Sequence, residues 1–191
     1  MEKLVIFGGA FDPIHNAHLL IAQDVYEKLN SQILIFQPAL LPPHKKVFAP
    51  FRDRVRMIKL AIANDDRFRC SDIEQRLTKP SYTIDILRAI KKENPDKKIY
   101  FIIGMDSAVD FHTWKEPDKI LKEFNIAVVP RPFFKKSDVK PEWRRHMKFI
   151  DTREIEISST EVRGRLKRGK TVKYLIPDDV ITYIQTKGLY K

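Results

Sequence analysis

The sequence predicts an α/β fold in which helices cover both faces of a mainly parallel sheet. Short apolar runs alternate with amphipathic stretches along the chain, and most of these runs end at Gly or Pro. The runs are almost entirely apolar, as expected for strands that helices cover on both sides. Consecutive parallel strands are then joined by right-handed crossovers. We expect one domain over residues 1–191, with a C-terminal helical subregion over about residues 158–191.

The predicted strands are β-branched and apolar runs bounded by turn residues. The clearest strands are expected at residues 3–7, 33–37, 98–103 and 125–129. Weaker strands are expected at residues 68–71, 148–150 and 155–157.

The predicted helices have apolar residues at helical spacing, and several are bounded by a recognisable stop or cap. They are expected at residues 17–29, 52–63, 84–92, 160–167 and 178–186. Asn30 and Gly188 are expected to end the first and the last of these, and Ser81 and Thr83 are capping candidates for the third. Residues 131–147 lack a regular pattern and are expected to form a surface excursion.

Positive charge is concentrated in one part of the chain. The 191 residues carry 36 Lys plus Arg against 25 Asp plus Glu, a net charge of +11. Residues 131–173 alone hold 14 basic and 6 acidic residues, a net of +8. A basic segment of this kind suits nucleic acid, an anionic membrane or a small phosphorylated substrate, and it also suits an ordinary solvated surface.

Several classes of protein are disfavoured by composition. Cys70 is the only cysteine, so an internal disulfide and a Cys-rich zinc site are excluded. The apolar run before Gly8 is too short for a signal peptide, and no stretch approaches the roughly 20 apolar residues of a membrane span. We expect a soluble, cytoplasmic protein with no membrane partner.

The loop after the first strand is the first place to look for a ligand, because open α/β sheets bind ligands beyond the carboxyl ends of their strands. Gly8 and Gly9 would let the backbone approach a phosphate, and the following helix N-terminus favours an anion. His15 and His18 are three residues apart and so share one helix face, where both rings can donate to phosphate oxygens. Phosphate binding, a structural role and a metal-ligand pair all remain open on these residues alone.

Six segments in chain order resemble the motifs of one enzyme family. GGAFDPIHNAH (8–18) resembles the G-x-F-D-P-x-H-x-G-H signature of the nucleotidyltransferase superfamily, whose fold is Rossmann-like. Later segments resemble motifs of bacterial nicotinate-nucleotide adenylyltransferases, and they are PPHK (42–45), PSYTID (80–85), FIIGMDS with FHTW (101–114), ISSTEVR (157–163) and YLIP with GLY (174–190). Ala17 departs from the superfamily Gly, and we expect this methyl group to leave activity intact.

The resemblance implies transfer of AMP from ATP to nicotinic acid mononucleotide, with pyrophosphate as the second product, in NAD biosynthesis. Mg²⁺ would be carried by ATP and pyrophosphate and not by protein ligands. The attacking phosphate is already ionised near neutral pH, so positioning and charge stabilisation would dominate catalysis. The implied partners are ATP and the mononucleotide, with no nucleic acid expected, in a single nucleotidyltransferase domain.

The resemblance also assigns the site residues. The implied catalytic residues are His15, His18, Lys45 and Arg163, with His18 nearest the α-phosphate. The other implied ATP contacts are Gly8, Gly9, Ala10, Phe11, Gly104, Asp106, Ser158, Ser159 and Thr160. The implied mononucleotide contacts are Lys45, Tyr82, Thr83, Asp106, Trp114 and Arg131. Asp12 could fix the first loop as readily as touch magnesium.

Two other kinds of function remain as alternatives. One is the same chemistry on another acceptor: nicotinamide mononucleotide, phosphopantetheine, or glycerol phosphate with CTP. Trp114 and the PSYT segment favour a pyridine nucleotide over the others. The other is a nucleic-acid-binding module, since Phe133, Phe134 and Trp143 are interleaved with basic residues.

Overall fold

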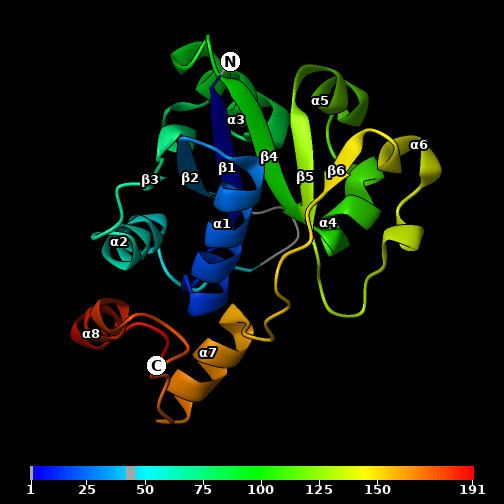
Figure 1. Ribbon diagram of the computed structural model, residues 1–191. Coiled ribbons are helices and arrows are strands. Elements are labelled where there is room, and N and C mark those ends of the chain that lie inside the picture. The colour runs from blue at the N-terminus through cyan, green and yellow to red at the C-terminus, as the bar shows by residue number, and fades with distance from the viewer. Residues whose placement is uncertain (1, 42–45) are drawn as a thin grey trace.

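A single parallel sheet forms the centre of the molecule (Figure 1). The computed structural model describes residues 2–41 and 46–191. In this part of the chain the sheet has six strands in the order β3-β2-β1-β4-β5-β6, and every neighbouring pair is parallel. The strands are β1 (Lys3–Gly9), β2 (Ile33–Pro38), β3 (Phe68–Cys70), β4 (Lys98–Gly104), β5 (Asn125–Val129) and β6 (Met147–Phe149).

Helices connect the strands and continue beyond β6. The α-helices are α1 (Asn16–Leu29), α2 (Phe51–Ala61), α3 (Thr83–Glu93), α4 (Met105–Val109), α5 (Pro117–Glu123), α6 (Pro141–Arg144), α7 (Ser159–Lys167) and α8 (Asp178–Lys187). Short 3₁₀ helices are η1 (Ile73–Arg76), η2 (Asp110–Thr113) and η3 (Lys136–Asp138). None of the helices within the described residues has the length and apolar character needed to cross a bilayer.

The two faces of the sheet carry separate apolar cores, because successive strand residues point to opposite sides. In β1, Val5 and Phe7 pack with residues of α1, α2 and α8, whereas Leu4 and Ile6 pack with residues of α3 and α5. All four side chains are buried. The predicted fold class is therefore confirmed: a parallel sheet with helices on both faces.

Two of the predicted helix ends are confirmed, and one predicted helix cap is wrong. Asn30 and Gly188 adopt the left-handed conformation after α1 and α8, as expected for residues that end a helix. The expectation that Ser81 and Thr83 cap α3 is wrong. Tyr82 is the cap residue, its N–H donates to the Asp85 carboxylate, and the Ser81 hydroxyl donates to Glu74.

The strand expected at residues 155–157 is also wrong, since these residues have no regular structure. After β6 the chain leaves the sheet and runs toward α7 (Figure 1), so the apolar run has no strand beside it. Ile157 packs instead against the core on the α1 side. The helices α4 and α5 were not predicted, because each is too short to show a clear apolar period.

The excursion at residues 131–147 lies on the surface but is anchored to the core. Val139 is fully buried, and Trp143 packs against Phe111 with ring centroids 5.7 Å apart. Phe133, by contrast, is 96% exposed. The buried Val139 and the half-buried Trp143 therefore fix the second half of this segment and leave its first half open to solvent.

The strand order reverses at β1. From β1 the chain builds β2 and β3 on one side of the sheet and then crosses over to build β4, β5 and β6 on the other. The helix α7 lies beyond the carboxyl edge of the strands (Figure 1). The carboxyl ends of β1 and β4 therefore form the switch point at which ligands bind in folds of this kind.

Candidate functional site

The two histidines of the first loop form a stacked pair at the start of α1. His15 is the cap residue and His18 lies three residues on; their ring centroids are 3.6 Å apart and the planes differ by 21°. The backbone N–H of His15 donates to Nδ1 of His18 over 3.2 Å. Because Nδ1 of His18 accepts, its hydrogen is carried on Nε2. Nε2 is therefore the ring atom through which His18 can donate a hydrogen bond.

His15 is electrically neutral near pH 7. Its side chain is 3% exposed, and burial together with the charge of Arg131 lowers its pKa to about 3. Nδ1 of His15 has no hydrogen-bond partner among residues 2–41 and 46–191. His15 therefore contributes a neutral ring and not a fixed cation.

The glycines before this pair are needed for packing. A Cβ atom on Gly8 would lie 2.7 Å from the ring of Phe101, and one on Gly9 would lie 2.9 Å from the ring of Phe11. The Phe11 ring is buried and packs edge-on against His18 with centroids 4.9 Å apart. These contacts bring the first loop and the histidine pair close to the end of β1.

The start of α1 is fastened by a distant segment. The N–H of Asn16 donates to the carbonyl of Leu175, and its side-chain amide donates to the carbonyl of Tyr174. One of the helix N–H groups expected to attract an anion is therefore already used. The groups that remain to attract an anion at this helix end are the imidazoles, the other amides and the helix dipole.

Asp12 fixes the first loop. Its carboxylate accepts hydrogen bonds from the N–H groups of Phe48 and Ala49 and from the hydroxyl of Tyr190, over 2.6, 3.0 and 2.7 Å. Burial and the bond to Asp12 raise the pKa of Tyr190. A carboxylate with three donors from two other segments is a structural junction, so Asp12 fixes the first loop.

The ISSTEVR segment meets the first loop at the start of α7. Ser158 caps α7 through a bond from the N–H of Glu161, as its residue type predicts. Ser159 donates to the carbonyl of Pro13 over 2.9 Å, and Arg163 donates to the carbonyl of Asp12 over 2.7 Å. Thus two motifs far apart in sequence lie in direct contact.

Arg163 is held in place by two further contacts. Its guanidinium lies over the ring of Phe48, 4.4 Å from the centroid, and donates to the hydroxyl of Thr160 over 3.1 Å. Its position at the first loop leaves it close to any anion bound there.

A second group of predicted residues lies at the ends of β4 and β5. Gly104 ends β4, and a Cβ atom there would meet both the Asp106 carboxylate and the side chain of Arg131. Nε of Arg131 is 3.9 Å from Oδ2 of Asp106. The charge of Arg131 also lowers the pKa of His15, so this group acts electrostatically on the histidine pair.

The third group contains aromatic residues. Trp114 is half-buried and packs against Phe111 and Phe101, with ring centroids 5.1 and 6.2 Å apart. Its neighbour Lys115 places Nζ 4.3 Å from the ring centroid of Tyr82. Lys115 therefore connects the Trp114 segment to the segment of Tyr82 and Thr83.

Lys115 is a candidate that the sequence reasoning missed. Its Nζ is also 3.5 Å from Oδ2 of Asp85, so the ammonium is partly paired. Its place directly after Trp114 was the available signal. Lys45 lies within residues 42–45, outside the described residues, so its predicted role is not placed here.

A known family model covers most of the chain. Residues 6–165 match the cytidylyltransferase-like family model. Over full length, the chain is 36% identical to a probable nicotinate-nucleotide adenylyltransferase of Clostridium tetani and 39% identical to one of Bacillus licheniformis. The chain belongs to the nicotinate-nucleotide adenylyltransferase family. Its first loop and its ISSTEVR segment both lie within the matched range.

Solved structures share the adenylyltransferase fold. A nicotinic acid mononucleotide adenylyltransferase of Plasmodium falciparum complexed with NaAD superposes with a TM-score of 0.81 at 24% identity, covering 100% of this chain and 98% of that one. The same Plasmodium protein complexed with APC gives a TM-score of 0.79 at 25% identity. These likenesses extend over the whole fold of this adenylyltransferase family member.

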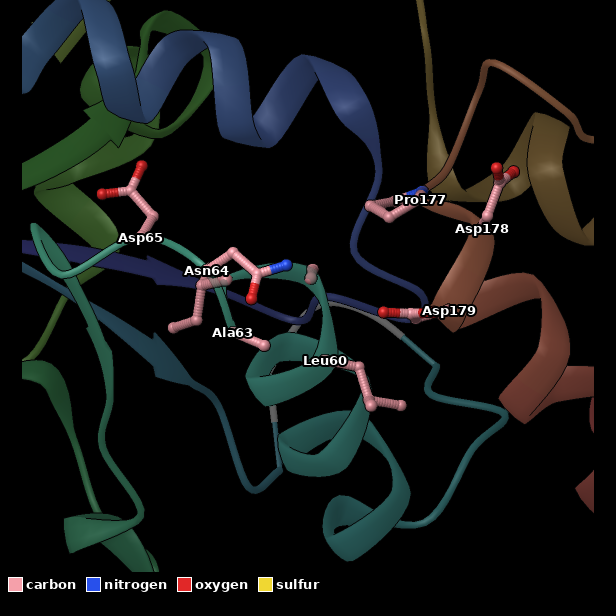
Figure 2. Close-up of a pocket in the computed structure, with 9 residues that line it drawn as sticks. Leu60, Ala63, Asn64, Asp65, Pro177, Asp178 and Asp179 are labelled. Carbon is pink, nitrogen blue, oxygen red and sulfur yellow. The ribbon is translucent and has the colours of Figure 1, made fainter.

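A surface groove elsewhere on the molecule differs in character from the site. It lies between the end of α2 and the start of α8 (Figure 2) and contains none of the predicted site residues. Three of its lining residues are Asp65, Asp178 and Asp179. Asp65 is paired with Arg67, and the negative charge of Asp178 and Asp179 disfavours a nucleotide phosphate. The edge at β1 and β4 therefore remains the candidate active site.

Proposed function

We propose that this protein transfers AMP from ATP to nicotinic acid mononucleotide, forming nicotinic acid adenine dinucleotide and pyrophosphate in NAD biosynthesis. The observation that carries the proposal is the direct contact between the first loop and α7, through Ser159 to Pro13 and Arg163 to Asp12. This contact gathers a histidine pair, a helix N-terminus and an arginine at the switch point of the sheet. The names of the relatives supply the acceptor.

The proposed chemistry is a displacement at the α-phosphorus of ATP. An oxygen of the mononucleotide phosphate forms a bond to that phosphorus, and the bond to the bridging oxygen breaks, so pyrophosphate leaves with the electron pair. The attacking oxygen is already ionised, so no strong general base is required. In this scheme Nε2–H of His18 donates to the α-phosphate as charge develops there.

The other phosphate groups have candidate ligands around the pair. Arg163 and the start of α7 are assigned to the β- and γ-phosphates, with Ser158, Ser159 and Thr160 at that helix end. His15, Lys45 and the backbone of Gly8 to Phe11 are assigned to the remaining phosphate contacts. These groups supply positioning and charge, which is what phosphoryl-type transfer requires.

The acceptor end is assigned to the aromatic group. Trp114 stacks on the pyridine ring in this proposal, and Tyr82 and Thr83 provide donors to its substituent. Asp106 accepts from ribose hydroxyls, and Arg131 binds a phosphate. Lys115 supports the acid over the amide, because an ammonium near Tyr82 favours a carboxylate.

Magnesium is treated as part of the ATP substrate. Among the described residues, no group of three or more His, Cys, Asp or Glu gathers closely enough to hold a metal ion. The Asp12 oxygens already accept three hydrogen bonds from the protein. The Asp12 carboxylate is thus already used by the protein, and we propose that the magnesium ion arrives on the ATP phosphates.

We also propose a cytoplasmic location. The proposed reaction uses ATP, and Cys70, the single cysteine of the sequence, needs no oxidising compartment. Burial raises the pKa of the Cys70 thiol to about 12, which fits an unreactive structural residue.

The direct test is pyrophosphate release from the purified protein with ATP and one acceptor at a time. The acceptors are nicotinic acid mononucleotide, nicotinamide mononucleotide and phosphopantetheine, with CTP and glycerol phosphate as a further pair. Release with nicotinic acid mononucleotide at a kcat/KM well above the others is expected. Preference for another acceptor, or no release at all, would overturn the proposal.

A further inference from the structure

Arg54 of α2 is a fully buried arginine whose hydrogen bonds go to backbone carbonyl groups. Its relative exposure is 0%. Nη1 donates to the carbonyls of Ala10 and Ala39 over 2.7 Å each, Nη2 donates to that of Leu40 over 3.1 Å, and Nε donates to that of Ala49 over 3.2 Å. One guanidinium therefore joins three segments: the first loop, the residues after β2, and the residues before α2.

Glu74 of η1 holds the same backbone from the other side. It is 3% exposed, and Oε2 accepts from the N–H of Leu40 over 2.9 Å. Oε1 accepts from the hydroxyl of Ser81 over 2.8 Å. The backbone of Leu40 is thus held on both sides: its N–H donates to Glu74, and its carbonyl accepts from Arg54. Glu74 also connects Leu40 to the segment that carries Tyr82.

The contacts form a continuous chain across the carboxyl edge of the sheet, with the buried side chains of Arg54 and Glu74 at its centre. It runs from Ser81 through Glu74, Leu40 and Arg54 to Ala10 in the first loop. Ala39 adds a bond from its N–H to the carbonyl of Gly9 over 2.8 Å. The predicted acceptor side and the predicted ATP side are therefore linked through side chains that are not assigned to either substrate.

A charge in this position needs a physical reason, because burial of an ion is costly. Burial lowers the pKa of Arg54, and the nearby charges of Asp12 and Glu74 act in the opposite direction. Apolar side chains often replace buried ions with no loss of stability. Only an arginine offers five N–H donors in a rigid fork, and four carbonyls converge here. The charge is therefore best explained by the need to fix several backbone segments at once.

We propose that Arg54 and Glu74 are positioning residues for adenylyl transfer, which rests on the proposed function above. They hold the backbone of residues 39–40 and 49 against the first loop, and so fix Ala10 and its neighbours relative to His15 and His18. They act through the backbone and do not touch the reacting atoms. Displacement of a substrate by about 1 Å can cost a hundredfold in rate, so such residues can matter greatly.

The experiment compares Arg54→Met with Arg56→Met, which removes an exposed arginine from the same helix. For each purified variant, kcat, both KM values and Tm are measured, together with the Kd of α,β-methylene-ATP. We expect Arg54→Met to lower kcat by about 10- to 100-fold in folded protein, and to weaken binding of the analogue, whereas Arg56→Met resembles the wild type. A folded Arg54→Met protein with wild-type kcat and Kd overturns the proposal.

Glu74 provides the second pair of variants, because Arg54→Met leaves four carbonyls without donors and can prevent folding. Glu74→Ala removes the acceptor for Leu40, and we expect a loss in kcat of about tenfold, the lower end of the range for misplacement. Glu74→Gln keeps an oxygen for the Leu40 N–H and an amide for the Ser81 hydroxyl, so it should restore kcat close to the wild type. A purely structural role predicts a lower Tm for Glu74→Ala with unchanged kcat, and that result contradicts the proposal.

Failure of this proposal can be told apart from failure of the proposed function. Binding of α,β-methylene-ATP requires no acceptor, so it reports on the first loop even if another acceptor is the true substrate. Wild-type protein that releases no pyrophosphate with nicotinic acid mononucleotide refutes the function alone. Unchanged affinity for the analogue in folded Arg54→Met and Glu74→Ala proteins refutes the positioning role alone.

Discussion

The first loop and the basic segment at residues 131–173 use charge in opposite ways. Around the first loop, Asp12 and Arg54 are buried and held by several hydrogen bonds each, and His15 is neutral. The basic segment has a net charge of +8, and most of its Lys and Arg side chains are exposed. Fixed groups stabilise charge at one point, whereas exposed cations create a diffuse field that salt screens. The number of charges therefore says less about the chemistry than their immobilisation does.

Removal of a fixed donor at the first loop should have the largest effect on the rate. We expect His18→Ala to lower kcat by about 100-fold or more, as for loss of a transition-state donor. Steady-state pyrophosphate release measures it, and near-ultraviolet circular dichroism checks the fold. The matched control is His112→Ala, which removes an exposed histidine and should leave kcat unchanged. Wild-type turnover by His18→Ala would exclude His18 from catalysis.

Trp114 tests whether an aromatic side chain half-buried in the core also serves the acceptor. Trp114→Ala should raise KM for the mononucleotide by about tenfold, in line with loss of one base-stacking contact, and should change KM for ATP much less. Trp114→Phe keeps an aromatic ring, so its KM for the mononucleotide should lie between those of the wild type and Trp114→Ala. Equal increases in both KM values would mean that Trp114 only supports the fold.

His15 tests how far the first loop is shielded from water. Its folded pKa of about 3 lies below the unfolded value of 6.5, so the unfolded chain takes up the proton first as the pH falls. This contribution to stability is complete above about pH 6.5 and is lost as the pH falls toward 3, at up to about 1.4 kcal/mol per pH unit. Urea unfolding at pH 7, 6 and 5 should show a shallower decline for His15→Asn than for the wild type. Parallel declines would show that His15 titrates normally.

The basic segment should give the smallest effect. We expect the triple change Lys135→Gln, Lys136→Gln and Lys140→Gln to leave kcat unchanged and to lower kcat/KM only about two- to threefold at low salt, through a weaker attractive field. The kcat/KM values of the wild type and the variant should become equal as salt is added. A fall in kcat that persists at high salt would show that one of these lysines has a fixed role.

Most of the fold could be read from local patterns. The four clearest strands were expected within one or two residues of their observed bounds, because a run buried on both faces must be continuously apolar. The stops at Asn30 and Gly188 were also predictable, since short or absent side chains tolerate the left-handed conformation. The run at residues 155–157 failed because a strand needs a neighbour, which no local pattern reports.

The candidate site could be read only in part. The spacing of His15 and His18 predicted a shared face, and the rings are stacked. Lys115 was missed because its approach to Tyr82 depends on two segments meeting in space. Arg54 and Glu74 were missed because a charged residue on an amphipathic stretch is normally exposed, and only the packed structure reveals its burial.

The sequence by itself determined the alternation of strands and helices, the order of the motifs and the family they indicate. Periodicity and turn chemistry act over a few residues, so they are visible in the chain alone. Only the tertiary structure decided that Asp12 joins the first loop to Tyr190, that His15 is neutral, and that Arg54 bonds four carbonyls. Burial, protonation and the pairing of buried polar groups depend on residues far apart in sequence, and they are fixed only when the chain packs.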